Sequence, residues 1–155
     1  MCGIVGGVTN KNITPLLLKG LKLLEYRGYD SSGLIVLCKN NNFDRARSVG
    51  KVANLVGNLN SRKQPISGNI GIAHTRWATH GEPTNHNAHP HISKNTVSVV
   101  HNGIIENYLE LKNNQLAKGY KFASETDTEV IAHSIDFAMK SCNSFLSSVQ
   151  KALKS

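Results

Sequence analysis

The sequence predicts an α+β domain, in which short strands fill most of the first hundred residues and helices dominate the remainder. Three observations support this class. A glycine-punctuated apolar run begins at Gly3, brief β-branched runs recur as far as His101, and helical spacing prevails after Leu109. The 155 residues are enough for one domain with a substantial core, or for a piece of a larger one.

Four runs have the length and composition of strands. Each is brief, contains β-branched residues and is flanked by polar residues or glycine. Because the first run starts almost at the beginning of the chain, we expect the N-terminus to be held in a sheet. The predicted strands are residues 3–9, 32–37, 69–74 and 95–101, with a polar turn at 39–42 and a polar loop at 57–68.

Helix signals occur in four segments. Thr14 followed by Pro15 is an N-cap and first-turn signal, after which Leu17, Leu21 and Leu24 recur on one helical face. The other predicted helices are residues 109–118, ending at Gly119; a helix opened by a Thr126–Glu129 capping box and running to about Lys140; and a last amphipathic helix at 145–153. Since the chain finishes on this apolar stripe, we expect it to be the front part of a larger fold.

The composition excludes several classes of function. Hydrophobic residues make up 39% and charged residues 18% of the chain, which is typical of a globular protein and not of a disordered one. The net charge is +8, but the basic residues are scattered and form no basic helix and no run interleaved with aromatics. We therefore expect no nucleic-acid binding.

The sequence also favours a cytoplasmic protein without a membrane span. The longest apolar stretch, residues 15–24, is interrupted by lysines and is far shorter than the roughly 20 residues that cross a bilayer. We see no secretory signal at the N-terminus. The three cysteines, Cys2, Cys38 and Cys142, are too few and odd in number for a disulfide framework.

Cys2 is the strongest candidate for a nucleophile. A small residue after the initiator Met permits removal of that Met, which leaves a thiol and a free α-amino group on one residue. A free α-amine titrates near 7.7–8.0 and a thiol near 8.5, so a proton passes between them at small cost. This is the arrangement of an N-terminal nucleophile; the alternative is a packed cysteine at the start of a strand.

Two further segments carry candidate binding groups. In the loop HTRWATHGEP at residues 74–83, Arg76 lies beside hydroxyls and a ring and can hold a carboxylate with two hydrogen bonds, or else pair with a structural carboxylate. Asn102 and Gly103 offer an amide side chain and an approachable backbone N–H, the composition of an oxyanion hole or of an ordinary Asn-Gly turn. Asp127 can pair with a substrate ammonium or complement a helix dipole.

Together these groups describe acyl transfer from an amino-acid amide, glutamine or asparagine. The thiol would attack the amide carbonyl, the oxyanion hole would hold the developing charge, and the cation and anion would bind the carboxylate and ammonium of the substrate.

Six short motifs of the chain resemble those of the class II glutamine amidotransferases. These motifs are CGIVG at 2–6, YRGYDSSG at 26–33, HTRWATHGEP at 74–83, NAHPH at 87–91, VVHNGIIENY at 99–108 and SETDTEV at 124–130. More narrowly, they are similar to the glutaminase domains of the isomerising glutamine:fructose-6-phosphate aminotransferases. Amidophosphoribosyltransferase relatives have a His-Arg-Gly-Gln-Asp pattern where this chain has YRGYD, and this difference favours the sugar-phosphate branch.

The resemblance implies a role for each matching residue. Cys2 would form a glutamyl thioester and release ammonia, with its own α-amine as general base, and Asn102 and Gly103 N–H would hold the oxyanion. The implied fold is a four-layer αββα N-terminal nucleophile hydrolase sandwich, incomplete at its C-terminal side. The implied substrate-binding residues are Arg76, Trp77, Thr79, His80 and Asp127, and Arg27 would support the terminus near Cys2.

The resemblance also limits what the chain is expected to do alone. The family's fold continues with further strands and two sugar-isomerase domains that these residues lack, so residues 1–155 would form a partial amidotransferase domain, a C-terminally truncated form. Fructose 6-phosphate would be reached only through the absent domains, and a homologous or complementing chain is a conceivable partner. The alternatives are a catalytically silent glutamine-binding fragment or regulatory module, and an amidophosphoribosyltransferase-type glutaminase.

His86, His89 and His91 are spaced closely enough to suggest metal ligands. No cysteine or carboxylate completes a tetrahedral set around them, and the stretch matches a loop of the family that binds no metal. We therefore expect neither a metal nor a cofactor.

Overall fold

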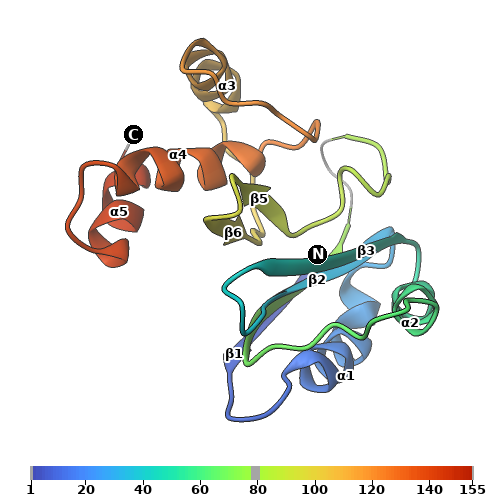
Figure 1. Cartoon of the computed structure of the whole chain (residues 1–155). Helices are drawn as coiled ribbons and strands as arrows, with labels where there is room; N and C mark the ends of the chain where they lie inside the picture. Colours follow the sequence, from blue (N-terminus) through green and yellow to red (C-terminus); the bar gives the residue numbers. More distant parts are fainter. Residues whose placement is uncertain (1, 78–80, 155) are drawn as a thin grey trace.

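A four-stranded antiparallel sheet is the larger of two sheets in the computed structural model, which describes residues 2–77 and 81–154 (Figure 1). In its register, Gly3 and Ser32 both lie opposite Thr75. The start of the first strand, the start of the second and the end of the fourth therefore meet at one end of the sheet. In spatial order the strands are β1 (Gly3–Val8), β4 (Ile70–Arg76), β2 (Ser31–Leu37) and β3 (Phe43–Val49).

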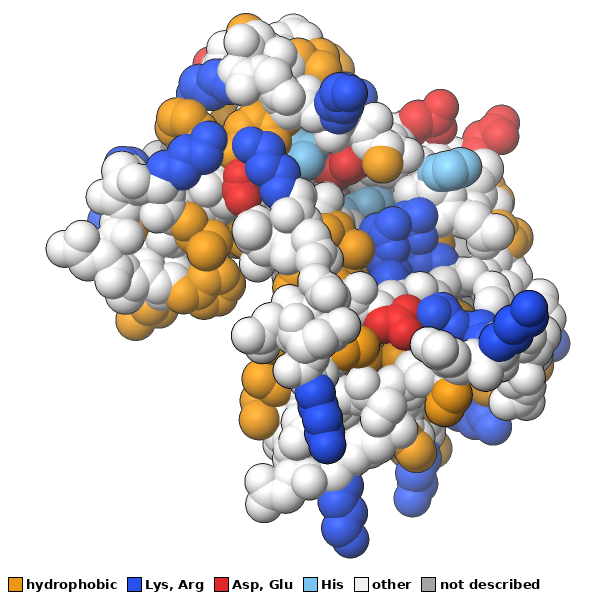
Figure 2. Space-filling model, in the orientation of Figure 1, with side chains coloured by type: hydrophobic (Ala, Val, Ile, Leu, Met, Phe, Trp, Pro, Cys, Tyr) orange, Lys and Arg blue, Asp and Glu red, His pale blue; other side chains and the backbone are white. Residues whose placement is uncertain are grey.

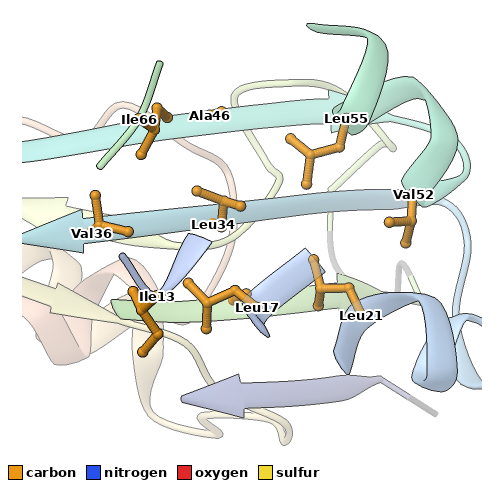
Figure 3. Close-up of a cluster of buried hydrophobic side chains, with 10 residues drawn as sticks. Ile13, Leu17, Leu21, Leu34, Val36, Ala46, Val52, Leu55 and Ile66 are labelled. Carbon is orange, nitrogen blue, oxygen red and sulfur yellow. The ribbon is translucent and has the colours of Figure 1, made fainter. Parts of the chain in front are cut away.

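Two helices cover one face of this sheet. Helix α1 (Thr14–Leu24) lies on β1 and β4 and leads into a short 3-10 turn, η1 (Glu25–Arg27), and α2 (Val52–Asn60) lies on β3. Leucines that are spaced four residues apart on α1 point into the space between helix and sheet (Figure 3), and burying each contributes about 1.5–3 kcal/mol. The core consists of Ile13, Leu17, Leu21, Leu34, Val36, Ala46, Val52, Leu55, Ile66 and Ala73.

A second, smaller layer lies on the opposite face of the sheet. Its sheet has two antiparallel strands, and a helix packs on both of them, so the layers run helices, sheet, sheet, helix (Figure 1). The elements of this layer are β5 (His91–Ser93), β6 (Val97–Val99), α3 (Tyr108–Ala117), α4 (Glu129–Met139) and α5 (Phe145–Ala152), and α5 packs on α4.

Backbone of residues 86–90 joins the second layer to the sheet. Arg47 Nη1 donates to the carbonyl oxygens of His86 at 2.9 Å and Ala88 at 3.0 Å, and Arg45 Nη1 donates to that of Pro90 at 3.0 Å. Burial lowers the pKa of Arg47 to about 10, so its guanidinium stays charged at neutral pH. Two strand arginines thus fasten the loop that leads into β5.

Gly33 allows this loop to approach β2 closely. A Cβ at Gly33 would lie 2.2 Å from the carbonyl oxygen of His89 and 3.0 Å from that of Ala46. Both atoms belong to backbone, so neither can move aside as a side chain could. The contact between the two layers therefore requires glycine at this position.

Most of the predicted elements are confirmed, including the N-terminal strand and the helices at 14–24 and 145–153. The assignment of Thr14 as an N-cap is wrong, because Thr14 is the first residue of α1 and its hydroxyl donates to the carbonyl oxygen of Ile66 at 3.0 Å. Strand β3 is missing from the sequence prediction, and the predicted loop at 57–68 is wrong in its first part, where α2 continues to Asn60. The predicted strand at 95–101 is also wrong in extent, because only residues 97–99 are a strand and β5 precedes it.

The proposed Thr126–Glu129 capping box is wrong as well. Thr126 Oγ1 lies 2.9 Å from His91 Nε2 instead of capping the helix, and Glu129 accepts hydrogen bonds from the backbone N–H groups of Ala123 and Ser124. The Thr126 hydroxyl therefore contacts His91 of β5 and does not cap the helix. Helix α4 begins at Glu129.

Within the described ranges, none of the helices has the length and apolar character needed to cross a membrane. On the face seen in Figure 2, the Lys and Arg side chains form separate patches interrupted by polar and apolar surface. This distribution agrees with the scatter of basic residues along the sequence.

Replacing Gly33 with Ala should lower the free energy of unfolding by about 1–3 kcal/mol, because the added methyl overpacks two backbone carbonyls. Urea denaturation followed by circular dichroism measures this change. Gly57→Ala in α2 is a matched control, since a Cβ there meets nothing within 4 Å, and we expect it to leave the stability unchanged or raise it by up to about 1 kcal/mol. Equal effects of the two substitutions would contradict the layer contact.

Candidate functional site

A cavity of about 530 Å³ opens where the meeting strand ends of the large sheet face the second layer. It is bounded by the residue before β1, the end of β4, the loop after β6 and the turn before α4. Segments up to 126 residues apart in the chain therefore contribute to one site. The residues named by the sequence analysis that line it are Cys2, Arg27, Arg76, Trp77, Asn102, Gly103 and Asp127.

The Cys2 thiol lies against the backbone of Trp77. The N–H of Trp77 donates to Cys2 Sγ at 3.2 Å, and Sγ is 3.6 Å from the carbonyl oxygen of the same residue. Gly28 makes room for this backbone, because a Cβ there would lie 3.0 Å from the nitrogen of Trp77. This hydrogen bond holds the sulfur against the backbone that follows β4.

Two amide groups lie beside this cysteine. Asn102 Nδ2 donates to the carbonyl oxygen of Cys2 at 3.1 Å, which brings a side-chain donor to the residue that carries the thiol. Gly103 follows in the same loop, and a Cβ there would lie 2.7 Å from His101 Nε2. The His101 ring thus leaves no room for a side chain at this position, which lines the cavity.

A buried cation and a buried anion also border the cavity. Arg76 is 4% exposed and donates to the carbonyl oxygens of Gly81 at 3.2 Å and Glu82 at 3.4 Å. Burial lowers the pKa of Arg76, while Cys2, Asp30 and Asp127 oppose the shift. Asp127 is 5% exposed, and its Oδ2 accepts from the N–H of Ile105 at 2.7 Å. This charge pattern suits a zwitterionic ligand.

The remaining predicted site residues are at the cavity's rim or outside the described ranges. Trp77 is about half exposed and its ring meets Tyr29 edge-on at a centroid distance of 5.8 Å. Arg27 lines the cavity and places its guanidinium carbon 5.8 Å from the centroid of the Tyr26 ring. Thr79 and His80 are among the residues 78–80 that the structure does not describe.

The cavity wall includes buried, stacked histidines that the sequence analysis did not connect with the site: His74 and His89 line the cavity, and His91 packs against His89. The rings of His74 and His89 stack at 4.2 Å, and those of His89 and His91 meet at 4.6 Å. Burial is the largest cause lowering all three pKa values, to about 4 for His74 and about 3 for His91. His86, by contrast, is exposed. The sequence did contain a signal for His74: it lies at the end of a predicted strand, two residues before Arg76, and side chains two residues apart on a strand lie on the same face of the sheet.

No group of three or more His, Cys, Asp or Glu side chains in residues 2–77 and 81–154 is arranged to hold a metal ion. His89 and His91 are neutral and buried, and His91 Nε2 is 2.9 Å from Thr126 Oγ1. These imidazoles therefore fill and hydrogen-bond the interior of the second layer.

Comparison with known families and proteins adds independent evidence. Residues 57–148 match the family model described as a glutamine amidotransferase domain. The chain is 54% identical over 154 residues to the isomerising glutamine–fructose-6-phosphate aminotransferase of Pseudomonas putida and 57% identical over 153 residues to that of Acinetobacter baylyi. Each alignment covers 99% of this chain but only 25% and 24% of the relative, respectively, so the chain spans about a quarter of their length.

Two solved structures share the fold. The glutamine phosphoribosylpyrophosphate amidotransferase from B. subtilis, in complex with ADP and GMP, matches 99% of this chain and 32% of its own with a TM-score of 0.73. A structure described as the allosteric regulatory enzyme of purine biosynthesis matches 98% of this chain and 33% of its own with a TM-score of 0.79. Both are 24% identical to this chain, so they establish the fold alone.

Lowering the pH from 7 to 5.5 should destabilise the folded chain. His74 and His91 titrate near pH 4 and 3 when folded, but near 6.5 when unfolded. At pH values between the folded and unfolded pKa, the unfolded chain binds more protons than the folded chain. The free energy of unfolding therefore decreases as the pH is lowered, by about 1 kcal/mol for each histidine between pH 7 and pH 5.5. Urea denaturation at both pH values measures the loss.

Substitutions separate this effect from the general titration of the chain. His91→Gln should reduce the loss of unfolding free energy between pH 7 and pH 5.5 by about 1 kcal/mol, the contribution of one buried histidine. His86→Gln, at an exposed position, is the matched control and should not reduce this loss. A stability that does not change between pH 7 and pH 5.5 would show that the buried imidazoles are not held neutral.

Proposed function

The chain belongs to the class II glutamine amidotransferase family, and on that basis we propose that it carries out the glutaminase half-reaction, converting glutamine and water to glutamate and ammonia. The observation that carries this proposal is the position of the Cys2 thiol. It borders a cavity that also holds two amide donors, a buried arginine and a buried aspartate. Nucleophile, oxyanion donors and both halves of an amino-acid clamp thus face one space.

In the proposed reaction, Cys2 Sγ attacks the side-chain carbonyl carbon of glutamine. Removal of Met1 frees the α-amine of Cys2, which accepts the thiol proton and passes it to the leaving nitrogen as the C–N bond breaks. Ammonia departs and a glutamyl thioester remains. Water then attacks the thioester, and glutamate leaves with the thiol restored. The Trp77 N–H, 3.2 Å from Sγ, holds the sulfur in position in this cycle.

The other site residues bind charge. Asn102 Nδ2 and the backbone N–H of Gly103 hold the oxyanion of both tetrahedral intermediates, where one donor is typically worth about 2.7–4 kcal/mol. Arg76 binds the α-carboxylate of glutamine and Asp127 its ammonium group. Trp77, which lines the cavity, contacts the substrate, and Arg27 supports the terminus. Thr79 and His80, which lie outside the described residues, are assigned to substrate binding from their sequence motif alone.

We further propose that residues 1–155 are a partial amidotransferase domain of αββα type. A second sheet of only two strands faces a sheet of four, and an apolar groove of about 180 Å³ opens between them beside Phe145. In the longer relatives, ammonia would pass to fructose 6-phosphate held by sugar-isomerase domains that these residues lack. The proposed location is the cytoplasm, and the proposed partner is a complementing homologous chain.

Cys2→Ala should abolish glutamate release from glutamine, because no other described thiol lines the cavity. A coupled glutamate dehydrogenase assay measures the release, and Cys142→Ala is the matched control that should retain it. Intact mass before and after incubation with a diazo-ketone analogue of glutamine reports the terminus and the nucleophile together. We expect loss of Met1 and one adduct on Cys2; glutamate release by folded Cys2→Ala would refute the mechanism.

Calorimetry distinguishes the catalytically silent alternative. A chain that binds glutamine with measurable heat but releases no glutamate would be a binding module or regulatory fragment. The amidophosphoribosyltransferase-type alternative is disfavoured by the YRGYD sequence at residues 26–30 and by the 54% identity to a sugar-phosphate enzyme.

Asp127→Asn should raise the KM for glutamine about 10- to 100-fold, because it removes the charged partner of the substrate ammonium. The asparagine keeps an oxygen for the Ile105 N–H, so the turn before α4 is retained. Steady-state kinetics measure the effect, with Asp44→Asn, which loses only a surface pair with Arg62, as the control. An unchanged KM in folded Asp127→Asn would remove Asp127 from the substrate site.

A further inference from the structure

The amide of Asn102 lies between two groups that constrain its orientation. On one side, its Nδ2 is 3.1 Å from the carbonyl oxygen of Cys2. On the other side, its Oδ1 is 2.9 Å from His74 Nε2. Asn102 itself is exposed and is carried by a loop without regular structure, so its backbone alone does little to fix the side chain.

The Cys2 carbonyl determines which way the amide faces. A carbonyl oxygen can only accept a hydrogen bond, so the NH₂ group of Asn102 must face Cys2 and its oxygen must face His74. That oxygen can likewise only accept. The proton on His74 must therefore reside on Nε2, and His74 Nε2–H donates to Asn102 Oδ1.

His74 is held rigidly enough to impose this orientation. It belongs to β4, is 1% exposed, and stacks on the ring of His89. Burial lowers its pKa to about 4, and its hydrogen bond to Asn102 opposes that shift only in part. A neutral imidazole carries one N–H, so at neutral pH the tautomer and the amide orientation are a single coupled choice.

We propose, resting on the glutaminase function above, that His74 is a positioning residue: its Nε2–H locks the Asn102 amide with the NH₂ group toward Cys2, the orientation needed to bind the oxyanion. With the opposite orientation, an amide oxygen would face the developing negative charge. His74 touches neither the thiol nor the oxyanion and acts only through Asn102. His74 thus has a role in the reaction as well as in packing.

The tautomer of His74 is measurable on the wild-type chain without any turnover. Long-range ¹H–¹⁵N correlations of the imidazole rings at pH 7 distinguish Nε2–H from Nδ1–H, and His74→Gln assigns the signals by their disappearance. We expect His74 as the neutral Nε2–H tautomer. A neutral Nδ1–H tautomer or a charged ring would overturn the proposal.

Kinetics test whether this hydrogen bond serves the reaction. His74→Leu should lower kcat for glutamate release about 10- to 100-fold with KM within about twofold, because the oxyanion donor is misplaced while the carboxylate and ammonium contacts remain. His74→Gln, which keeps an N–H donor at a similar reach, should recover most of the lost kcat. If Leu and Gln variants that fold have equal kcat values, the donor has no positioning role.

A double-mutant cycle separates positioning from general damage to the fold. In an Asn102→Ala background, His74→Leu should change kcat by less than about twofold, since it acts only through the amide that is gone. An equal loss in both backgrounds would assign the effect to the fold instead. His133→Leu is the control for loss of a buried histidine: His133 is 3% exposed, bonds Ser93 Oγ at 2.8 Å, and should keep its kcat.

These outcomes also separate the two proposals. If the wild-type chain releases no glutamate and forms no adduct on Cys2, the glutaminase function fails, whereas the imidazole spectrum still decides the tautomer. If the wild-type chain is active and the His74 variants match it, only the positioning role fails. Where His74→Leu does not fold, the His74→Gln kinetics and the wild-type spectrum decide the question.

Discussion

The antiparallel register between β1 and β4 is the constraint on which the site depends. Gly3 pairs with Thr75, and the Gly3 N–H donates to Thr75 Oγ1 at 3.1 Å, so Cys2, the residue before β1, lies at the end of β4 within reach of Trp77. A shift of one residue would turn every side chain of β1 to the opposite face. Because the register is held by a whole ladder of backbone hydrogen bonds, the contact between Cys2 and Trp77 does not rely on a flexible terminus.

The second layer supplies what the first cannot, namely the amide donors and the acidic group. Its approach to the sheet depends on a missing side chain at Gly33 and on two strand arginines that bond backbone carbonyls at residues 86–90. The interior between the layers is nonetheless polar, because the rings of buried histidines stack there. Stability and site geometry are therefore coupled, because the same imidazoles that fill the layer contact Asn102 and Thr126.

Local patterns predicted the elements that have strong local signals. Helix α1 carries a Pro at its start and leucines at helical spacing, and the strands around residues 3–8 and 70–76 are apolar runs bounded by polar residues. Strand β3 escaped prediction because its sequence, FDRARSV, is polar; it is a strand because the backbone of β2 pairs with it along its whole length. The Thr126 hydroxyl was assigned to a helix cap, but His91 lies close enough to bind it.

The sequence by itself determined the chemistry that is available: a cysteine at position 2, an arginine, an aspartate and an Asn-Gly pair, in motifs that resemble one family. It also determined the class of fold, since periodicity and turn signals are local properties. Only the tertiary structure decided that these groups, up to 125 residues apart, line one cavity, and that His74 meets the Asn102 amide. The physical reason is that strand register and the distance between layers arise from packing and hydrogen bonds between remote segments, which no local window of the sequence contains.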